Sequence, residues 1–362
     1  MSKIDYLLGK KIMPQQLAAW GQKAMEKSGV SQADAAIAID IFVAADTRGI
    51  FSHGTRQLLP LMKIVKDGRI NTKAAPQTVL DKLSVAVIDG HDAFPTTIAY
   101  EGMKLAIAKA KKTGMGYVTV RHGNHIGAIS YYPLMAASEG LIGLAMTNTD
   151  PCMTVPGGKG PILGTNPIAY AIPTGNDRPV FLDIATSCVA ATKIITTKAL
   201  GKKLPEKWLV DEHGVPTDDP SLYPDKATLL PMAYHKGYGL AVLVETLCAM
   251  ISGSAFLSGV NGWLNDNPKP TNQGHAFIAV DIASMTPKEE FFQRMRKMTD
   301  EIVNAPKADN AERIFLPGEI EHEKREKSLK EGIILPDFAL VNLLGLAESI
   351  GDVEGLNALF KP

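Results

Sequence analysis

Two pairs of short β-branched segments lie too close together in the chain to be joined by a crossover helix. Residues 78–80 and 84–88 form the first pair, and residues 168–172 and 180–184 form the second. Parallel neighbours need a connection of a dozen or more residues, so each pair is expected to be antiparallel. Further strands and helices are expected at 96–112, 117–120, 128–138, 141–146, 187–200, 237–257 and 276–282. The sequence therefore predicts an α/β domain with a mixed, largely antiparallel sheet.

The two ends of the chain are predicted to be helical. Residues 14–29 place apolar side chains on one helical face, and residues 32–49 are alanine-rich and apolar on most sides, which is typical of a helix inside a bundle. The charged tail contains an apolar segment at 338–346 that is expected to rejoin these helices. We therefore predict a helical domain, built from residues 1–75 and 285–362, beside a mixed-sheet domain of residues 76–284.

Charge and cysteine content argue against several classes of protein. Lysine plus arginine (38) equals aspartate plus glutamate (38), so no global field attracts nucleic acid or an anionic membrane. The most apolar stretch, residues 239–256, contains Glu245 and is interpreted as a buried helix, not a membrane span. The three cysteines form no CxxC pair, and the N-terminus lacks the features of a secretory signal. A cytoplasmic location is expected, without nucleic-acid or membrane partners.

The densest group of candidate functional residues is the segment RHGNHIG at 121–127, between an expected strand and an expected helix. α/β proteins bind ligands at such positions, and His125 is closely flanked by Gly123 and Gly127. An imidazole there is a candidate general acid and base. From the residues alone, a turn histidine held by backbone hydrogen bonds is the more common alternative. His122 and His125 could also bind zinc, but no third ligand follows at a metal-site spacing, so no metal site is predicted.

A second candidate is the segment Ser52-His53-Gly54, with Arg48 and Arg56 nearby. Together these side chains could bind a carboxylate through a hydroxyl, an imidazole and a guanidinium. The chain contains no GxSxG elbow, so a serine nucleophile is not supported. An ordinary polar connection between helices is the simpler alternative.

Glycine-rich loops and one helix start provide candidate phosphate sites. Residues 147–151 and 156–167 follow a strand and are rich in glycine, but neither GxGxxG nor GxxxxGK[ST] occurs in the chain. At 235–239, free amides and Lys236 could hold a pyrophosphate at the start of a helix. A lysine that only solvates the helix start explains this segment equally well.

Taken together, these motifs resemble the malate/L-lactate dehydrogenase family of the non-Rossmann type. The motifs run in order over almost the whole chain: SHG at 52–54, NHIGAIS at 124–130, TDP at 149–151, GTNP at 164–167, LDIAT at 182–186, HKGYGLA at 235–241 and LPGE at 316–319. The resemblance implies a helical domain, a mixed-sheet domain that binds NAD or NADP, with NAD slightly preferred, and a homodimer with its sites near the subunit interface. The absence of GxGxxG is expected for this fold.

The resemblance also assigns residues. It makes His125 the proton acceptor in alcohol oxidation and the donor in carbonyl reduction, and it places Ser52 and His53 in the substrate pocket. The positions that match cofactor contacts are Thr149, Asp183, Ile184, Ala185, Lys236, Gly318 and Glu319. Where the family commonly has an arginine, four residues after the SHG histidine, this chain has Gln57.

Two arginines, Arg48 and Arg56, are candidates to bind the carboxylate of the substrate. Arg56 lies one position early, and along an α-helix that shift turns a side chain by about 100°. Either Arg48 binds the carboxylate instead, or the start of the helix is shifted so that Arg56 can bind it, or the substrate differs.

The function implied is hydride transfer between NAD(P) and a pair of 2-hydroxy and 2-keto acids, with malate and oxaloacetate as the first expectation. Ureidoglycolate or lactate oxidation and reduction of a cyclic imine are alternatives within the family. A catalytically inactive relative that binds nucleotide and a metallohydrolase that uses His122 and His125 are alternatives of a different class.

Overall fold

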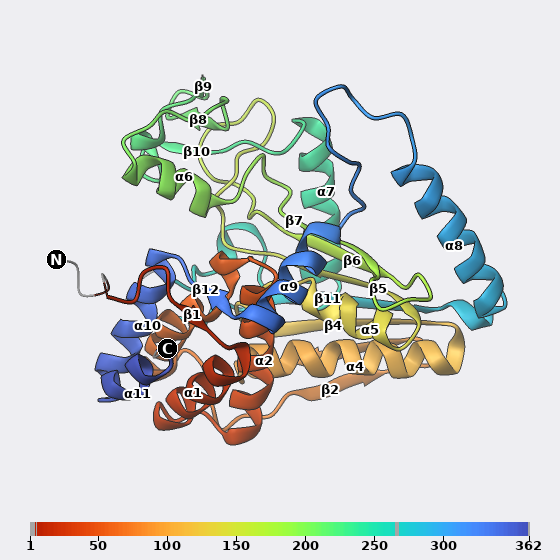
Figure 1. Cartoon of the computed structure of the whole chain (residues 1–362), viewed down its shortest axis with the longest axis horizontal. Helices are drawn as coiled ribbons and strands as arrows, with labels where there is room; N and C mark the ends of the chain where they lie inside the picture. Colours follow the sequence, from red (N-terminus) through yellow and green to blue (C-terminus); the bar gives the residue numbers. More distant parts are fainter. Residues whose placement is uncertain (1–3, 5, 265–267, 361–362) are drawn as a thin grey trace.

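A mixed sheet forms the centre of the molecule in the computed structural model, which describes residues 4, 6–264 and 268–360 (Figure 1). Within these residues the sheet has seven strands in the order β2-β3-β4-β11-β5-β6-β7. Their bounds are β2 (Gln77–Asp81), β3 (Val85–Asp89), β4 (Met115–Gly123), β5 (Leu141–Thr147), β6 (Ile168–Ile172), β7 (Val180–Ile184) and β11 (Gln273–Asp281). Only β3 and β4 pair in parallel; the other five pairings in this sheet are antiparallel. The predicted mixed, largely antiparallel sheet is thus confirmed, including both predicted hairpins.

The parallel pair is joined by a crossover helix, α4 (Pro95–Thr113), which covers one face of the sheet with α5 (Tyr131–Ser138). Pro95 starts α4, and Gly114 ends it in the left-handed conformation with φ of 87°. The helix lies very close to β4, because a Cβ added to Gly116 would come within 2.0 Å of the Ala106 carbonyl oxygen. This packing fixes the carboxyl end of β4, from which the segment at 121–127 emerges.

The helical part contains α1 (Pro14–Lys27), α2 (Gln32–Thr47) and α3 (Leu58–Lys66) from the N-terminal region, and α10 (Asp337–Ser349) and α11 (Val353–Ala358) from the C-terminal region. They share one hydrophobic core, and β1 (Lys11–Ile12) pairs with β12 (Ile333–Ile334). Figure 1 shows both chain ends beside this part, whereas α8 (Lys288–Val303) lies at the opposite edge of the molecule. The tail therefore meets the first helices, while the domain boundaries at 75/76 and 284/285 stay a prediction.

A small lobe was not foreseen from the sequence. It contains α6 (Ala191–Ala199) and a three-stranded sheet of β8 (Leu209–Asp211), β9 (Pro216–Thr217) and β10 (Ala227–Leu229) around a core of its own. These strands have only two or three residues each, which is too short for an alternating pattern to be visible. The helix predicted from residue 187 begins at Ala191, after an irregular segment.

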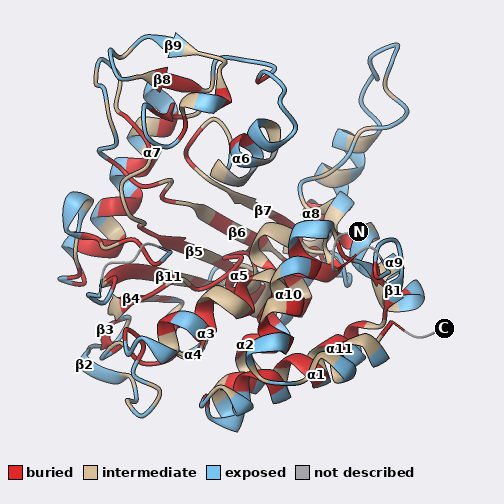
Figure 2. Cartoon of the chain, turned by 90° about the vertical axis from the view of Figure 1, so that its left-hand side faces the viewer, coloured by how far each residue is buried: buried red, intermediate tan, exposed pale blue. Residues whose placement is uncertain are grey.

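The buried helix predicted for residues 239–256 is helical only as far as Met250 and is buried on one side only. Helix α7 (His235–Glu245) continues into a π-helical turn, η4 (Thr246–Met250), and only one side of it packs on the sheet, through Val244 and Cys248. On its other side Val242 is 42% exposed and Met250 is 50% exposed. Figure 2 shows the central strands largely buried or intermediate and the exposed residues on outer helices and loops. No helix among the described residues is both long enough and apolar enough to cross a bilayer.

Candidate active site

His125 follows β4 and lies in a cluster of aromatic rings. Its imidazole stacks on the Trp263 indole, with ring centroids 4.3 Å apart and planes at 5°, and the His53 ring centroid is 5.6 Å away. Its Nε2 atom is buried and has no hydrogen-bond partner among the described residues. Buried polar atoms in proteins are nearly always satisfied, so an unpartnered one is a candidate place for a ligand atom.

The electrostatic environment keeps both imidazoles neutral. Burial, helped by the neighbouring His53, His275 and Arg56, lowers the pKa of His125 well below 6.5. Burial and the charge of Arg56 lower the pKa of His53 to about 4. At neutral pH His125 is therefore a base with a free lone pair, ready to accept a proton.

The SHG segment forms two 3₁₀ turns, η1 (Phe51–His53) and η2 (Thr55–Gln57). The Ser52 hydroxyl lies 2.8 Å from His53 Nδ1, and Gln57 donates to the Ser52 carbonyl at 2.6 Å. Gln57 thus fastens the turn. In a 3₁₀ turn, with three residues per turn, a shift of one position rotates a side chain by about 120°.

The structure separates the two candidate arginines. Arg56 acts electrostatically on both His53 and His125, whereas the buried Nε atoms of Arg48 and Arg56 alike have no partner in the described part of the chain. Arg48 caps α2, donates to the Ala44 carbonyl, and lines a small hollow with Ser130 at the start of α5. Burial and Arg325 of α9 (Glu319–Glu331) lower the pKa of Arg48 to about 10. Arg56 therefore belongs to the histidine cluster, and Arg48 lies beside α5 and α9.

The glycine of the SHG segment is required by a buried carboxylate that sequence reasoning missed. Asp46 Oδ2 accepts hydrogen bonds from the backbone N–H and the hydroxyl of Thr55, at 3.0 and 2.6 Å. A Cβ at Gly54 would lie 1.8 Å from Asp46 Oδ1. Burial raises the pKa of Asp46 to about 7, although the Thr55 hydrogen bonds oppose the shift. The signal in the sequence was an aspartate at the second-last position of α2, nine residues before Thr55.

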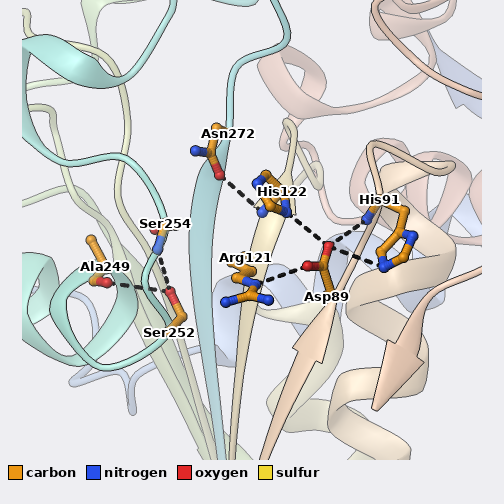
Figure 3. Close-up of polar contacts among 8 residues, drawn as sticks. All are labelled: Asp89, His91, Arg121, His122, Ala249, Ser252, Ser254 and Asn272. Carbon is orange, nitrogen blue, oxygen red and sulfur yellow. Dashed lines mark hydrogen bonds and ion pairs between the residues drawn. The ribbon is translucent and has the colours of Figure 1, made fainter. Parts of the chain in front are cut away.

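A second carboxylate holds the strand that leads to His125 (Figure 3). Asp89, at the end of β3, accepts hydrogen bonds from Arg121 Nε at 2.9 Å, from the His91 N–H at 3.0 Å and from His122 Nδ1 at 2.8 Å. Burial alone would raise the pKa of Asp89, but these hydrogen bonds outweigh it and lower the pKa to about 2. Asp89 is thus a permanent anion that ties β3 to the segment at 121–127.

The environment of His122 bears on the zinc hypothesis. His122 donates its Nδ1 proton to the ionised Asp89, and its backbone N–H donates to Asn272 Oδ1 at 3.0 Å. The part of the chain that the structure describes contains no group of three or more His, Cys, Asp or Glu side chains arranged to hold a metal ion. In the structure, His122 therefore supports the end of β4 through its contacts with Asp89 and Asn272.

A further buried histidine, also missed, lies beneath the loop. His275 of β11 contacts the Thr147 hydroxyl at 2.8 Å, and a Cβ at Gly123 would lie 2.3 Å from its Nε2. Burial lowers the pKa of His275 to about 3. The glycine at 123 is thus explained by the ring below it.

Three loops that carry predicted cofactor residues are joined by a series of hydrogen bonds. The Thr165 N–H donates to the Thr149 hydroxyl, and Thr186, directly after Asp183-Ile184-Ala185, donates to the Thr165 carbonyl. Met232 donates in turn to Thr186, and the N–H of Gly237, next to Lys236, donates to Met232. The structure therefore brings Thr149, residues 183–185 and Lys236 to one edge of the sheet.

The remaining predicted cofactor residues lie on the other side of β7. Gly318 has φ of 83° and is packed so tightly on Phe181 that a Cβ would lie 2.3 Å from the ring. Glu319 accepts from the Leu316 N–H at 2.9 Å and so closes its own turn. Asp183 accepts from the N–H of Ser130, which lies five residues after His125.

These surroundings fit a dinucleotide. Lys236 is exposed at the start of the eleven-residue helix α7, and no atom of the described chain lies within 4 Å of a Cβ added to Gly239. An open helix start with a lysine suits a pyrophosphate, and the hydroxyl of Thr149 and the carboxylate of Asp183 suit hydroxyl groups of ribose.

A buried glutamate organises the loops around this edge. Glu245 of α7 accepts from Asn148 Nδ2 at 3.1 Å, from Asn166 Nδ2 at 2.6 Å and from the Leu257 N–H at 2.9 Å. The three partners come from three separate segments. Sequence reasoning noted Glu245 only as an interruption of an apolar stretch, because its partners lie far away in the chain.

Comparison with known proteins agrees with this architecture. The family model described as malate/L-lactate dehydrogenase matches residues 12–343. The malate dehydrogenase of Pyrococcus abyssi is 38% identical over 353 residues, covering 96% of each chain. The solved structure of sulfolactate dehydrogenase from Methanocaldococcus jannaschii superimposes with a TM-score of 0.88 at 36% identity, covering 95% of this chain and 98% of that one. Malate dehydrogenase from Entamoeba histolytica gives 0.89 at 31% identity, covering 94% and 98%.

The fold and the site thus define an oxidoreductase built around a buried histidine. The chain belongs to the malate/L-lactate dehydrogenase family.

The carboxyl group of Asp46 leads to a prediction about pH and stability. Its folded-state pKa, about 7, lies above the usual value of 3.8, so its contribution to stability is complete below about pH 4 and is lost as the pH rises through 7. Asp46→Asn should remove this dependence, so the urea midpoint of the variant should fall less than that of the natural protein between pH 4 and pH 7. The exposed Asp67→Asn variant should follow the natural protein. Parallel curves for Asp46→Asn and the natural protein would contradict the assignment.

Proposed function

We propose that this protein is an NAD(P)-dependent 2-hydroxy-acid dehydrogenase that interconverts malate and oxaloacetate. The observation that carries the proposal is the buried, unpartnered Nε2 of His125, beside His53 and Arg56. The 38% identity to a malate dehydrogenase over 96% of the chain supports malate as the first candidate, and an equally identical L-sulfolactate dehydrogenase makes sulfolactate the substrate to compare.

The residues around His125 have two roles in the proposed reaction, proton transfer and binding of the carboxylate. In alcohol oxidation the substrate hydroxyl donates its hydrogen bond to His125 Nε2, and the proton moves to this nitrogen as the carbonyl forms. In carbonyl reduction the same nitrogen returns the proton to the oxygen. Ser52, His53 and Arg56 hold the carboxylate next to the reacting carbon, and the aromatic and buried surroundings exclude water.

The cofactor is held by Thr149, Asp183, Ile184, Ala185, Lys236, Gly318 and Glu319, and NAD is preferred to NADP. When bound, its nicotinamide exchanges the hydride with the substrate carbon. Asp183 accepts a hydrogen bond from Ser130, which lies five residues after His125. This contact supports placing the nicotinamide end of the cofactor beside the substrate.

The substrate assignment is tested by following NADH and NADPH oxidation with oxaloacetate, sulfopyruvate, pyruvate and a cyclic imino acid, and NAD reduction with ureidoglycolate. Fastest turnover with oxaloacetate supports the proposal and identifies the preferred cofactor. Faster turnover with another substrate would replace malate within the same chemistry. Tight nucleotide binding without turnover on any of them would favour the catalytically inactive relative.

His125→Asn should lower kcat by about 10²- to 10⁴-fold, because the variant lacks a group that accepts the proton. Binding of the reduced cofactor, measured by its fluorescence, should be retained, since the predicted cofactor residues are unchanged. The exposed His213→Asn on the β8–β9 turn is the control and should leave kcat unaltered. Near-normal turnover of His125→Asn would remove the assignment.

Arg56→Gln should raise the KM for oxaloacetate by about 10- to 100-fold, because a charge-assisted hydrogen bond to the carboxylate is lost. Arg56→Lys should recover only part of the loss, since lysine lacks the planar two-pronged geometry. Arg48→Gln serves as the comparison, because Arg48 lies beside α5 and α9. A larger rise in KM for Arg48→Gln than for Arg56→Gln would reverse the assignment of the carboxylate.

The protein is further proposed to be a homodimer that uses the uncovered face of the sheet and α7. On the face opposite α4 and α5, apolar side chains are only half-buried: Ile142, Leu144, Tyr170, Ile172 and Leu182. The exposed side of α7 and the segment after it continue this surface with Val242, Leu243, Met250, Ile251 and Phe256. Contiguous apolar surface of this kind is typical of an interface between subunits.

The natural protein should therefore sediment as a dimer of 38.9 kDa chains. Replacing Leu243 and Met250 together by lysine should give a monomer, because burying two charges at the interface is costly. Leu83→Lys, at the 85% exposed tip of the β2–β3 hairpin, is the control. A natural protein that sediments as a monomer contradicts the proposal, and so does a double variant that stays dimeric.

A further inference from the structure

Trp263 makes the closest ring contact with His125. Its indole is parallel to the imidazole within 5°, at a centroid distance of 4.3 Å, and only 8% of Trp263 is exposed. Neither the motifs nor the proposed roles above include this residue. One face of the imidazole is thus covered by an indole, while the tilted ring of His53 lies 5.6 Å away.

The segment that carries Trp263 also forms hydrogen bonds with the backbone of the His125 loop. The Thr271 hydroxyl donates to the Gly123 carbonyl at 2.7 Å, and Asn272 Oδ1 accepts from the His122 N–H at 3.0 Å. The Asn261 N–H donates to the Thr271 carbonyl, which closes this segment on itself near Trp263. These hydrogen bonds hold the segment of Trp263 against the His125 loop and so help to keep the indole over the imidazole.

The stack has an electrostatic consequence, because burial and three neighbours oppose a positive charge on His125. The neighbours are His53 and Arg56 from the SHG turns and His275 from β11. The face of an indole attracts a cation, most strongly where water is excluded. Among these contacts, the indole is the group that favours the imidazolium formed when His125 takes a proton.

We propose that Trp263 is a positioning residue that fixes the plane of the His125 ring and stabilises its protonated form during alcohol oxidation. The catalytic part of this inference rests on the proposed function. The contact itself does not, so it can be tested in the protein without substrate or cofactor.

The first test uses tryptophan fluorescence, because a protonated imidazole in contact with an indole quenches its emission. The natural protein should lose part of its emission as the pH falls from about 6.5 to the lowest pH at which circular dichroism shows it folded, because burial lowers the pKa of His125. His125→Asn should lack this step, while Trp208→Phe should retain it. If His125→Asn shows the same quenching as the natural protein, the contact does not report on His125 and the proposal fails.

The second test compares Trp263→Leu with Trp263→Phe in malate oxidation. Trp263→Leu should lower kcat about tenfold, which corresponds to about 1.4 kcal/mol, and should shift the acid limb of the kcat/KM profile to lower pH. Trp263→Phe keeps an aromatic face and should recover part of both effects. The matched pair Trp208→Leu and Trp208→Phe, in the β8–β10 lobe, should leave both unchanged.

The outcomes separate the inference from the proposed function. Equal kcat and equal pH profiles for Trp263→Leu and the natural protein would overturn the inference, and so would an equal loss in the two Trp263 variants without a pH shift, which indicates packing alone. If no 2-hydroxy acid is oxidised but the fluorescence step is present and depends on His125, the contact stands and the proposed function fails.

Discussion

The pairing of β11 with both β4 and β5 is the constraint on which the site depends. β11 comes about 130 residues after β5 in the chain, yet it lies between β4 and β5 in the sheet. This insertion brings Asn272 and His275, and with them the segment that carries Trp263, against the loop of His125. Without the insertion of β11, the segment after β4 would extend into solvent. His125 would then have neither its ring contacts nor surroundings that exclude water.

Burial then sets the chemistry of the groups that this pairing assembles. His125, His53 and His275 are all held neutral by loss of solvent, whereas Asp89 stays ionised because four polar contacts reach it. Asp46 shows the opposite balance, since two hydrogen bonds are too few to offset burial. The two carboxylates thus differ in pKa because Asp46 is more deeply buried and receives fewer donors, none of them from a cationic side chain.

Much of the fold could be predicted from local pattern, because short connections exclude parallel pairs and glycines end helices. The motifs also selected His125 and the SHG turn as candidates, and the structure brings the two together. The small β8–β10 lobe could not be predicted, since strands of two or three residues carry no period. Trp263, His275, Asp46 and Glu245 were missed because each acts through partners that are distant in sequence or buried by tertiary packing. The proposed choice of Arg56 over Arg48 needed the charges around each arginine in the folded chain.

Helix α7 connects two properties of the molecule that are usually considered separately. One side carries Glu245, which fastens the loops of Asn148 and Asn166, and the other side presents the apolar surface proposed for the second subunit. A displacement of this helix would therefore change the coenzyme pocket and the subunit contact together. Dilution of the protein and depletion of its coenzyme would then act on the same equilibrium, each weakening what the other supports.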